Sequence, residues 1–248
     1  MVAKISSAGI KRALPSLLSS SSTSSLRLHR GAMHAWWTND ALGGKRPLVK
    51  PGSWMVLGYV GVAVACAGLA AVVGRNPFVT PAWLGTTGLT GAMLSAGLGA
   101  TIGAATIAAT RALARRAVWI RALHTDLRPV VRGEGTITLV AMAVASGVGE
   151  EILFRGLLVP AIGVVASALA FGAIHQVRGR ARWAWMAWAA LMGLLFALLF
   201  ECTGSLLGPI VAHVYVNACN LRFLRDHNLE PKRARRLGGL LDRDRNAR

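Results

Sequence analysis

Long apolar runs alternate with short, arginine-rich segments along most of this chain. A helix that crosses the hydrocarbon core of a bilayer needs about 20 mostly apolar residues, and six runs approach that requirement. The stretch GLGATIGAA in the second run is rich in small residues, which let two helices approach closely in lipid. The pattern predicts an all-α, polytopic membrane helix bundle of about six transmembrane helices, over about Trp54–Val73, Trp83–Thr110, a third run from near Thr136, Val164–Gln176, Trp183–Cys202 and Leu206–Leu224.

Composition agrees with this pattern. Of the 248 residues, 54% are hydrophobic and 15% are charged, whereas a soluble domain usually carries about a quarter charged residues. The three cysteines all lie in apolar runs, so they indicate neither a disulfide framework nor a cysteine-based zinc site.

The two ends of the chain differ from this apolar middle. Residues 1–50 are rich in Ser, Lys and Arg and contain a single acid, Asp40, so we expect a disordered tail. An organellar transit peptide has a similar composition, and translation from Met33 would shorten the tail; both alternatives stay open. Residues 51–225 form the predicted membrane domain, and residues 226–248 form a basic C-terminal tail.

The net charge of +18 is distributed unevenly among the connections. Lys and Arg gather in both tails, in the 111–132 linker and in the 178–182 loop, whereas the 74–82 connection carries one Arg. By the positive-inside rule both termini are predicted to be cytoplasmic, in a bacterial inner membrane or, as the alternative, a eukaryotic organelle membrane. Within the linker, Ala117–Asp126 is predicted to lie along the membrane surface as an amphipathic helix. Because the basic residues lie between apolar spans, the predicted partner is the lipid bilayer and not nucleic acid.

Three charged side chains stand inside the third apolar run, in the stretch GVGEEILFRG. An ionised side chain at the centre of a membrane helix costs at least about 2.5–3.5 kcal/mol. Glu151 and Arg155 are four residues apart and share a helix face, so we expect them to pair, which offsets part of that cost. Glu150 points about 100° away from Glu151, has no such partner and is free to face a cavity. An intramembrane carboxylate of this kind indicates a functional site.

Polar residues of other runs fall at the same depth as Glu150. A helix break is predicted near Gly163, and Glu150 lies thirteen residues before it and His175 twelve after it. Both side chains are therefore roughly 18–20 Å from the turn, while His213 and Asn217 are roughly 14 and 20 Å from the turn between the last two spans. Each histidine alone could be a hydrogen-bonded core residue, and Asn217 alone could bridge helices. Their shared depth instead predicts a polar active-site cavity at mid-membrane depth.

Three short motifs at these positions resemble those of the CPBP family of intramembrane endopeptidases, relatives of the CAAX-processing protease. They are EEILFR (Glu150–Arg155), FGAIH (Phe171–His175) and HVYVN (His213–Asn217). The ordered set covers about residues 130–222, and the N-terminal half matches only as membrane helices. The resemblance implies that residues 51–225 form a CPBP-like protease domain.

The resemblance also implies a role for each motif residue. Glu150 would act as the general base on a water that His175 helps to hold. His213 and Asn217 would stabilise the oxyanion of the tetrahedral intermediate. The supporting residues would be Glu151, Arg155 and Phe171.

The predicted function is hydrolysis of peptide bonds in membrane-associated peptide or protein substrates, with prenylated CAAX-type substrates as one option. The alternatives are a non-catalytic membrane scaffold or bacteriocin-immunity factor, and a proton-coupled transporter. The transporter is disfavoured because no inverted repeat is evident. We expect no required cofactor, because no His-Glu-x-x-His motif occurs. The alternative is zinc, held by Glu150, His175 and His213.

Overall fold

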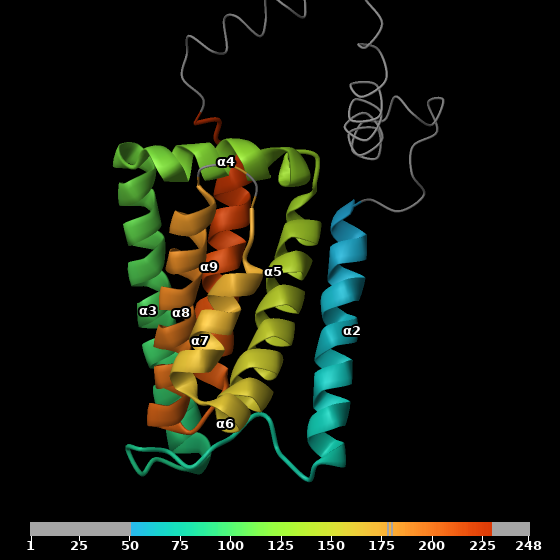
Figure 1. Ribbon diagram of the computed structural model, residues 1–248, viewed down its shortest axis with the longest axis vertical. Helices are drawn as coiled ribbons and strands as arrows, with labels where there is room; N and C mark the ends of the chain where they lie inside the picture. The colour runs from blue at the N-terminus through green and yellow to red at the C-terminus, as the bar shows by residue number, and fades with distance from the viewer. Residues whose placement is uncertain (1–50, 178, 180, 230–248) are drawn as a thin grey trace, which may run out of the picture. The chain divides into compact units, whose positions relative to one another are not determined.

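The computed structural model describes residues 51–177, 179 and 181–229, and every regular element in that part of the chain is a helix (Figure 1). The expected tails, at 1–50 and over most of 226–248, lie outside the described residues. The helices are α2 (Pro51–Val72), α3 (Gly88–Arg116), α4 (Val118–Val131), α5 (Thr136–Glu151), the π-helix η2 (Ile152–Leu158), α6 (Val159–Ile162), α7 (Val164–Ile174), α8 (Arg182–Thr203) and α9 (Leu207–Asp226).

The long helices lie side by side, and α4 crosses over their ends (Figure 1). The prediction of an all-α, polytopic bundle is confirmed, although two of the six expected spans are atypical. One is α7, which is apolar but has 11 residues, and the other is α9, which has 20 residues but carries several polar side chains. The helical segments long and apolar enough to cross a membrane are Gly52–Val72, Gly88–Arg116, Thr136–Ile162 and Arg182–Thr203.

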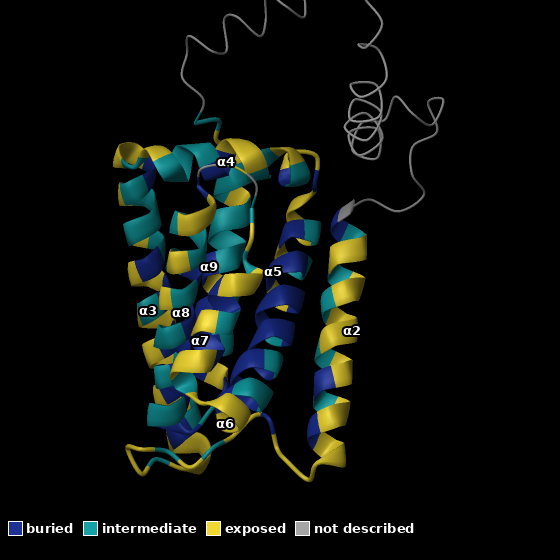
Figure 2. Ribbon diagram, in the orientation of Figure 1, coloured by how far each residue is buried: buried dark blue, intermediate teal, exposed yellow. Residues whose placement is uncertain are grey.

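Large apolar side chains cover much of the outer surface of the bundle, and its interior combines an apolar core with a smaller set of buried polar residues. Figure 2 shows α2 largely exposed and α5 largely buried, and large side chains such as Trp54, Leu89 and Ile137 lie on the outer surface. This distribution suits contact with lipid tails, which solvate apolar groups well. Helix α5 is therefore the central element, and its polar residues face the interior of the bundle.

Helices α3 and α9 cross closely through small residues. A side chain at Gly99 would overlap the backbone of Gly208, and one at Gly103 would press on the Tyr215 ring. The Ser95 hydroxyl of α3 accepts a hydrogen bond from the Gly208 N–H at 2.9 Å. The close approach predicted from the GLGATIGAA stretch is confirmed.

The predicted break near Gly163 is present, because that residue adopts a φ of +84° and reverses the chain between α6 and α7. The sequence did not predict the π-helix that follows Glu151. Its wider winding is seen at the Phe154 carbonyl, which accepts the N–H of Val159, five residues later. The Ser167 hydroxyl of α7 donates to the same carbonyl at 3.1 Å. The hydrogen bond from Ser167 ties α7 back onto η2.

The surface helix predicted over Ala117–Asp126 corresponds to α4, which extends to Val131. Leu123 and His124 are buried while Thr125 is exposed, so the helix is amphipathic. Its buried face covers one end of the bundle interior.

Candidate active site

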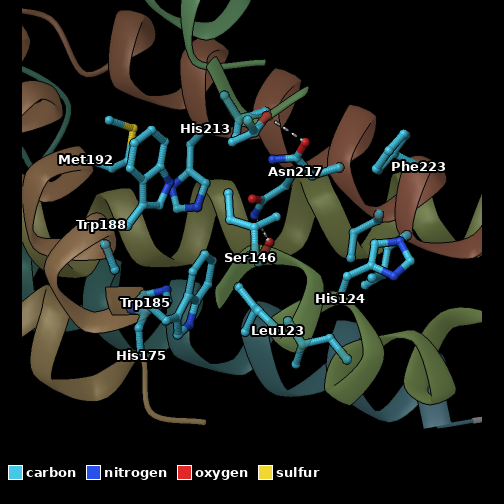
Figure 3. A pocket seen from close by; sticks show the side chains of 18 of the residues that line it. Leu123, His124, Ser146, His175, Trp185, Trp188, Met192, His213, Asn217 and Phe223 are labelled. Carbon is cyan, nitrogen blue, oxygen red and sulfur yellow. Dashed lines mark hydrogen bonds between the residues drawn. The ribbon is translucent and has the colours of Figure 1, made fainter. Parts of the chain in front are cut away.

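A pocket of about 310 Å³ lies between the helices and is bordered by α4 at one end. All four residues predicted to be catalytic line it: Glu150, His175, His213 and Asn217. Figure 3 shows His175 at one side of this pocket and His124 at the other. A cavity shared by these four residues is therefore present, although most of its wall is apolar.

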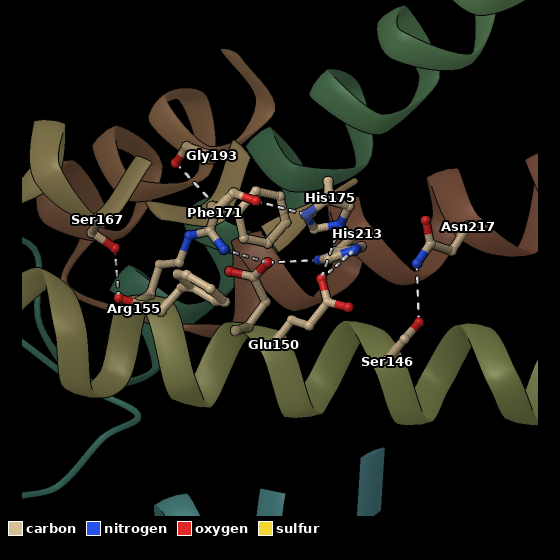
Figure 4. Close-up of polar contacts among 11 residues, drawn as sticks. Ser146, Glu150, Arg155, Ser167, Phe171, His175, Gly193, His213 and Asn217 are labelled. Atoms are coloured by element: carbon tan, nitrogen blue, oxygen red, sulfur yellow. Dashed lines mark hydrogen bonds and ion pairs between the residues drawn. The ribbon is translucent and has the colours of Figure 1, made fainter. Parts of the chain in front are cut away.

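Glu150, near the end of α5, is the centre of the polar cluster (Figure 4). Its Oε2 atom lies 3.7 Å from Nε2 of His175 and 3.7 Å from Nε2 of His213. The carboxylate is buried, and this oxygen has no hydrogen-bond partner among the described residues. Both histidines thus present a ring nitrogen to one carboxylate oxygen, at a distance that suits a shared water better than a direct hydrogen bond.

His175 directly follows α7, and the end of that helix fixes its ring. Its Nδ1 atom lies 2.7 Å from the carbonyl oxygen of Phe171. Because a carbonyl can only accept, Nδ1 carries the proton and the neutral ring has a free acceptor at Nε2. The Phe171 ring lies against the imidazole, with 4.4 Å between centroids, so it forms a wall of the site beside His175.

The expected ion pair is present, since Nη1 of Arg155 donates to Oε1 of Glu151 at 3.0 Å. Nη2 of Arg155 also donates to the Gly193 carbonyl at 3.0 Å, and its guanidinium lies over the Phe171 ring. The same Glu151 oxygen lies 2.7 Å from Nδ1 of His213. Glu151 therefore orients His213 as well as pairing with Arg155. The sequence did not predict the contact between Glu151 and His213.

Asn217 lies one turn beyond His213 on α9 and also faces α5. Its Nδ2 atom donates to the hydroxyl of Ser146 at 3.0 Å, and that hydroxyl donates to the Ala143 carbonyl at 3.3 Å. Ser146 was not predicted as a site residue, although it precedes Glu150 by four residues and so shares its helix face. The second N–H of the Asn217 amide remains available to a ligand in the pocket.

Aromatic residues also line the pocket, and the sequence pattern did not predict them as site residues. Tyr59 of α2 lines the pocket and lies close enough to Glu150 to interact with its carboxylate. Trp185 and Trp188 of α8 also line it, and the Trp185 ring lies 6.0 Å from that of His175. The two tryptophans are three residues apart on one helix and therefore share a face, and this spacing could have identified them from the sequence.

Glu150, His175 and His213, the candidate ligands of the zinc alternative, meet in the pocket. Among residues 51–177, 179 and 181–229, no group of three His, Cys, Asp or Glu side chains is arranged so that it could hold a metal ion, and these three are no exception.

Comparisons with known proteins agree with the three motifs. Residues 132–219 match the family described as type II CAAX prenyl endopeptidase Rce1-like. A 77-residue stretch, 30% of this chain, is 36% identical to "Uncharacterized protein YpbD" of Bacillus subtilis (strain 168), and it spans 40% of that protein. No solved structure matches this chain. The resemblance to the CAAX-protease-like family is confirmed for the segment that contains Glu150, His175, His213 and Asn217.

Proposed function

We propose that this protein is an intramembrane endopeptidase in which Glu150 activates a water molecule for attack on a peptide bond. The observation that carries the proposal is the convergence of Glu150 with Nε2 of both His175 and His213, at 3.7 Å each, inside a buried pocket. The membrane-spanning character of the helices and the family match at residues 132–219 support it.

The first step uses Glu150 and His175. A water between them can donate one hydrogen to the carboxylate and the other to Nε2 of His175, the acceptor that the Phe171 carbonyl leaves free. As the water oxygen attacks the peptide carbon, Glu150 takes the first proton. Ser146 is not the nucleophile in this scheme, because its hydroxyl bonds Asn217 and a backbone carbonyl and makes no hydrogen bond to a carboxylate or a histidine among the described residues.

The second step needs hydrogen-bond donors for the oxyanion. Nδ1 of His213 lies 2.7 Å from Oε1 of Glu151, which leaves Nε2 as the ring nitrogen that faces the pocket. When the ring carries a proton on both nitrogens, Nδ1–H donates to Glu151 and Nε2–H can donate to the oxyanion. The free N–H of Asn217 provides a second donor from the same helix.

Collapse of the tetrahedral intermediate completes the reaction. The carbon–nitrogen bond breaks, and Glu150 returns its proton to the leaving nitrogen. The carboxylic acid product gives its proton to the amine, so the products are a carboxylate and an ammonium ion, and the ionised Glu150 is regenerated. The cycle consumes one water and requires no oxidant, reductant or cofactor.

The test compares the parent protein with Glu150→Gln in phosphatidylcholine liposomes, using a quenched fluorescent peptide. Glutamine keeps the size of the side chain but cannot accept the proton, so we expect cleavage to fall by about 10²–10⁴-fold without loss of folding. Glu201→Gln is the matched control, because Glu201 is an acid in a membrane helix that does not line the pocket. Near-parental cleavage by a folded Glu150→Gln protein would contradict the proposal and favour a scaffold function.

Two further arms of this experiment address the metal and the substrate. A zinc chelator should leave the rate unchanged, whereas inactivation that added zinc reverses would contradict the metal-free mechanism. Matched peptides with and without a prenyl group on cysteine test whether the substrate is lipidated. We expect the prenylated peptide to be cleaved faster, because its chain can partition into the bilayer beside the pocket.

A further inference from the structure

Helix α2 contacts the rest of the bundle along one narrow stripe, and most of its remaining surface is exposed (Figure 2). The stripe follows intervals of four and three residues, which keep its members on one face of a helix. None of its six members is exposed: Gly52, Val56, Tyr59, Ala63, Cys66 and Ala70. Tyr59 is the largest of the six side chains and the only one with a hydroxyl group, so it is the exception in a stripe of mostly small residues.

The packing of α2 on α5 places Tyr59 beside the reactive carboxylate. A Cβ added at Gly149 would lie 2.8 Å from the Tyr59 carbonyl oxygen and 3.8 Å from the Ala63 nitrogen, so α5 passes directly against this turn of α2. Glu150 follows Gly149, and both Glu150 and Tyr59 line the same pocket. The Tyr59 hydroxyl lies close enough to the Glu150 carboxylate to act as its hydrogen-bond donor.

Glu150 needs such a donor, because its nearest polar neighbours do not fix its orientation. Its Oε2 atom lies 3.7 Å from Nε2 of His175 and of His213, and it has no hydrogen bond among the described residues. The last torsion of a glutamate side chain is broad, so a carboxylate without hydrogen bonds can adopt many orientations. Glu151 differs in this respect, because its Oε1 atom contacts both Arg155 and His213.

We propose that Tyr59 is a positioning residue for the hydrolysis, and that its hydroxyl donates a hydrogen bond to Glu150 and keeps Oε2 directed at His175 and His213. This inference rests on the proposed function and adds a residue that lies outside the family match at 132–219. Hydrogen bonds at catalytic sites often tighten only when the substrate is bound, so the contact should be strongest during turnover. The phenol keeps its proton throughout, and the proton transfers of the reaction are unchanged.

The first test measures kcat and KM for the quenched fluorescent peptide in phosphatidylcholine liposomes. Tyr59→Phe keeps the ring and removes only the hydroxyl, so its melting temperature should match that of the parent. We expect kcat to fall by about 10–100-fold, as for loss of a hydrogen bond to a charged group, while KM stays unchanged because the hydroxyl does not bind the peptide. Tyr215→Phe is the matched control, because Tyr215 is the only other tyrosine, is exposed and does not line the pocket.

Infrared difference spectra test the contact without requiring turnover. Subtracting the spectrum of Glu150→Gln from that of the parent isolates the carboxylate stretch of Glu150. The same subtraction is then made in the Tyr59→Phe and Tyr215→Phe backgrounds. Because the frequency of a carboxylate stretch depends on its hydrogen bonds, the band should shift with Tyr59→Phe and stay in place with Tyr215→Phe.

The two measurements separate this inference from the proposed function. Parental kcat in Tyr59→Phe, with cleavage still lost in Glu150→Gln, would overturn the positioning role and leave the proposed function intact. A higher KM with unchanged kcat would also overturn it, because the hydroxyl would then bind the peptide and not Glu150. So would a carboxylate band that does not move in Tyr59→Phe. If the parent cleaves no peptide, the proposed function fails, whereas a band shift confined to Tyr59→Phe still supports the hydrogen bond to Glu150.

Discussion

The adjacent residues Glu150 and Glu151 differ in their partners, and this difference predicts opposite effects on stability. Glu151 and Arg155 are at most 1% exposed and pair with each other, so Arg155→Ala leaves a buried carboxylate without its cation. We expect a loss of about 3–5 kcal/mol in the free energy of unfolding. Glu150→Gln should melt at or above the parent temperature, because it neutralises a buried carboxylate that forms no ion pair with an arginine among the described residues.

Thermal unfolding in detergent checks this prediction, with Arg75→Ala as the control. Arg75 is exposed and should change stability by less than about 0.5 kcal/mol. If Arg155→Ala is as heat-stable as Arg75→Ala, the pair does not support the fold.

His124 predicts how stability depends on pH. Burial lowers the pKa of His124 below its usual range, the nearby charges of Arg128, His227 and Arg111 act in the same direction, and a backbone contact with Phe223 opposes them only in part. Below about pH 6.5 the unfolded chain therefore binds a proton that the folded chain does not, so stability falls as the pH falls and is unaffected above that value. Melting temperatures measured between about pH 5 and pH 8 should decline less in His124→Phe than in the parent. A parallel decline in both proteins would show that His124 makes no contribution.

At the scale of elements, helix geometry explains which parts of the site could be predicted from sequence. Glu150 and His175 meet because each lies a similar number of residues from the turn at Gly163, and the rise per residue of a helix is nearly constant. Contacts that depend on the rotation of one helix relative to another could not be predicted by counting residues from a turn. The bond between Asn217 and Ser146 is of this kind, and so is the approach of Tyr59 to Glu150.

The packing of α2 on α5 gives a prediction at the same scale. A side chain added at Gly149 would lie 2.8 Å from the Tyr59 carbonyl, so Gly149→Ala should push α2 away and move Tyr59 relative to Glu150. We expect a loss of about 1–3 kcal/mol and slower peptide cleavage. Gly61→Ala in α2 is the control, because no atom lies within 4 Å of the added carbon. Equal melting temperatures and rates for the two variants would show that this contact is not needed.

At the scale of the whole molecule, polar residues that line the pocket make some helices less apolar than a membrane span usually is. The sequence predicted six spans because every apolar run was counted, but α9 contributes His213, Asn217 and Asn220 to the pocket and is correspondingly polar. The short α7 packs one face against α8, where its residue Gly172 meets the Met186 carbonyl closely, and exposes large apolar side chains such as Leu169 on the other. Two of the helices that contribute to the site, α7 and α9, thus depart from an ideal membrane span, whereas α5 carries Glu150 within an apolar segment long enough to cross a membrane.

The orientation of the whole bundle is the last prediction. The 111–132 linker is rich in arginine, and the connection after α2 carries one, so we expect the end covered by α4 to face the cytoplasm. In a background without the three native cysteines, Gly133→Cys and Gly179→Cys should react with a membrane-impermeant maleimide added from the cytoplasmic side. Arg75→Cys should react from the opposite side only. Labelling of Arg75→Cys and Gly133→Cys from one side would contradict this topology.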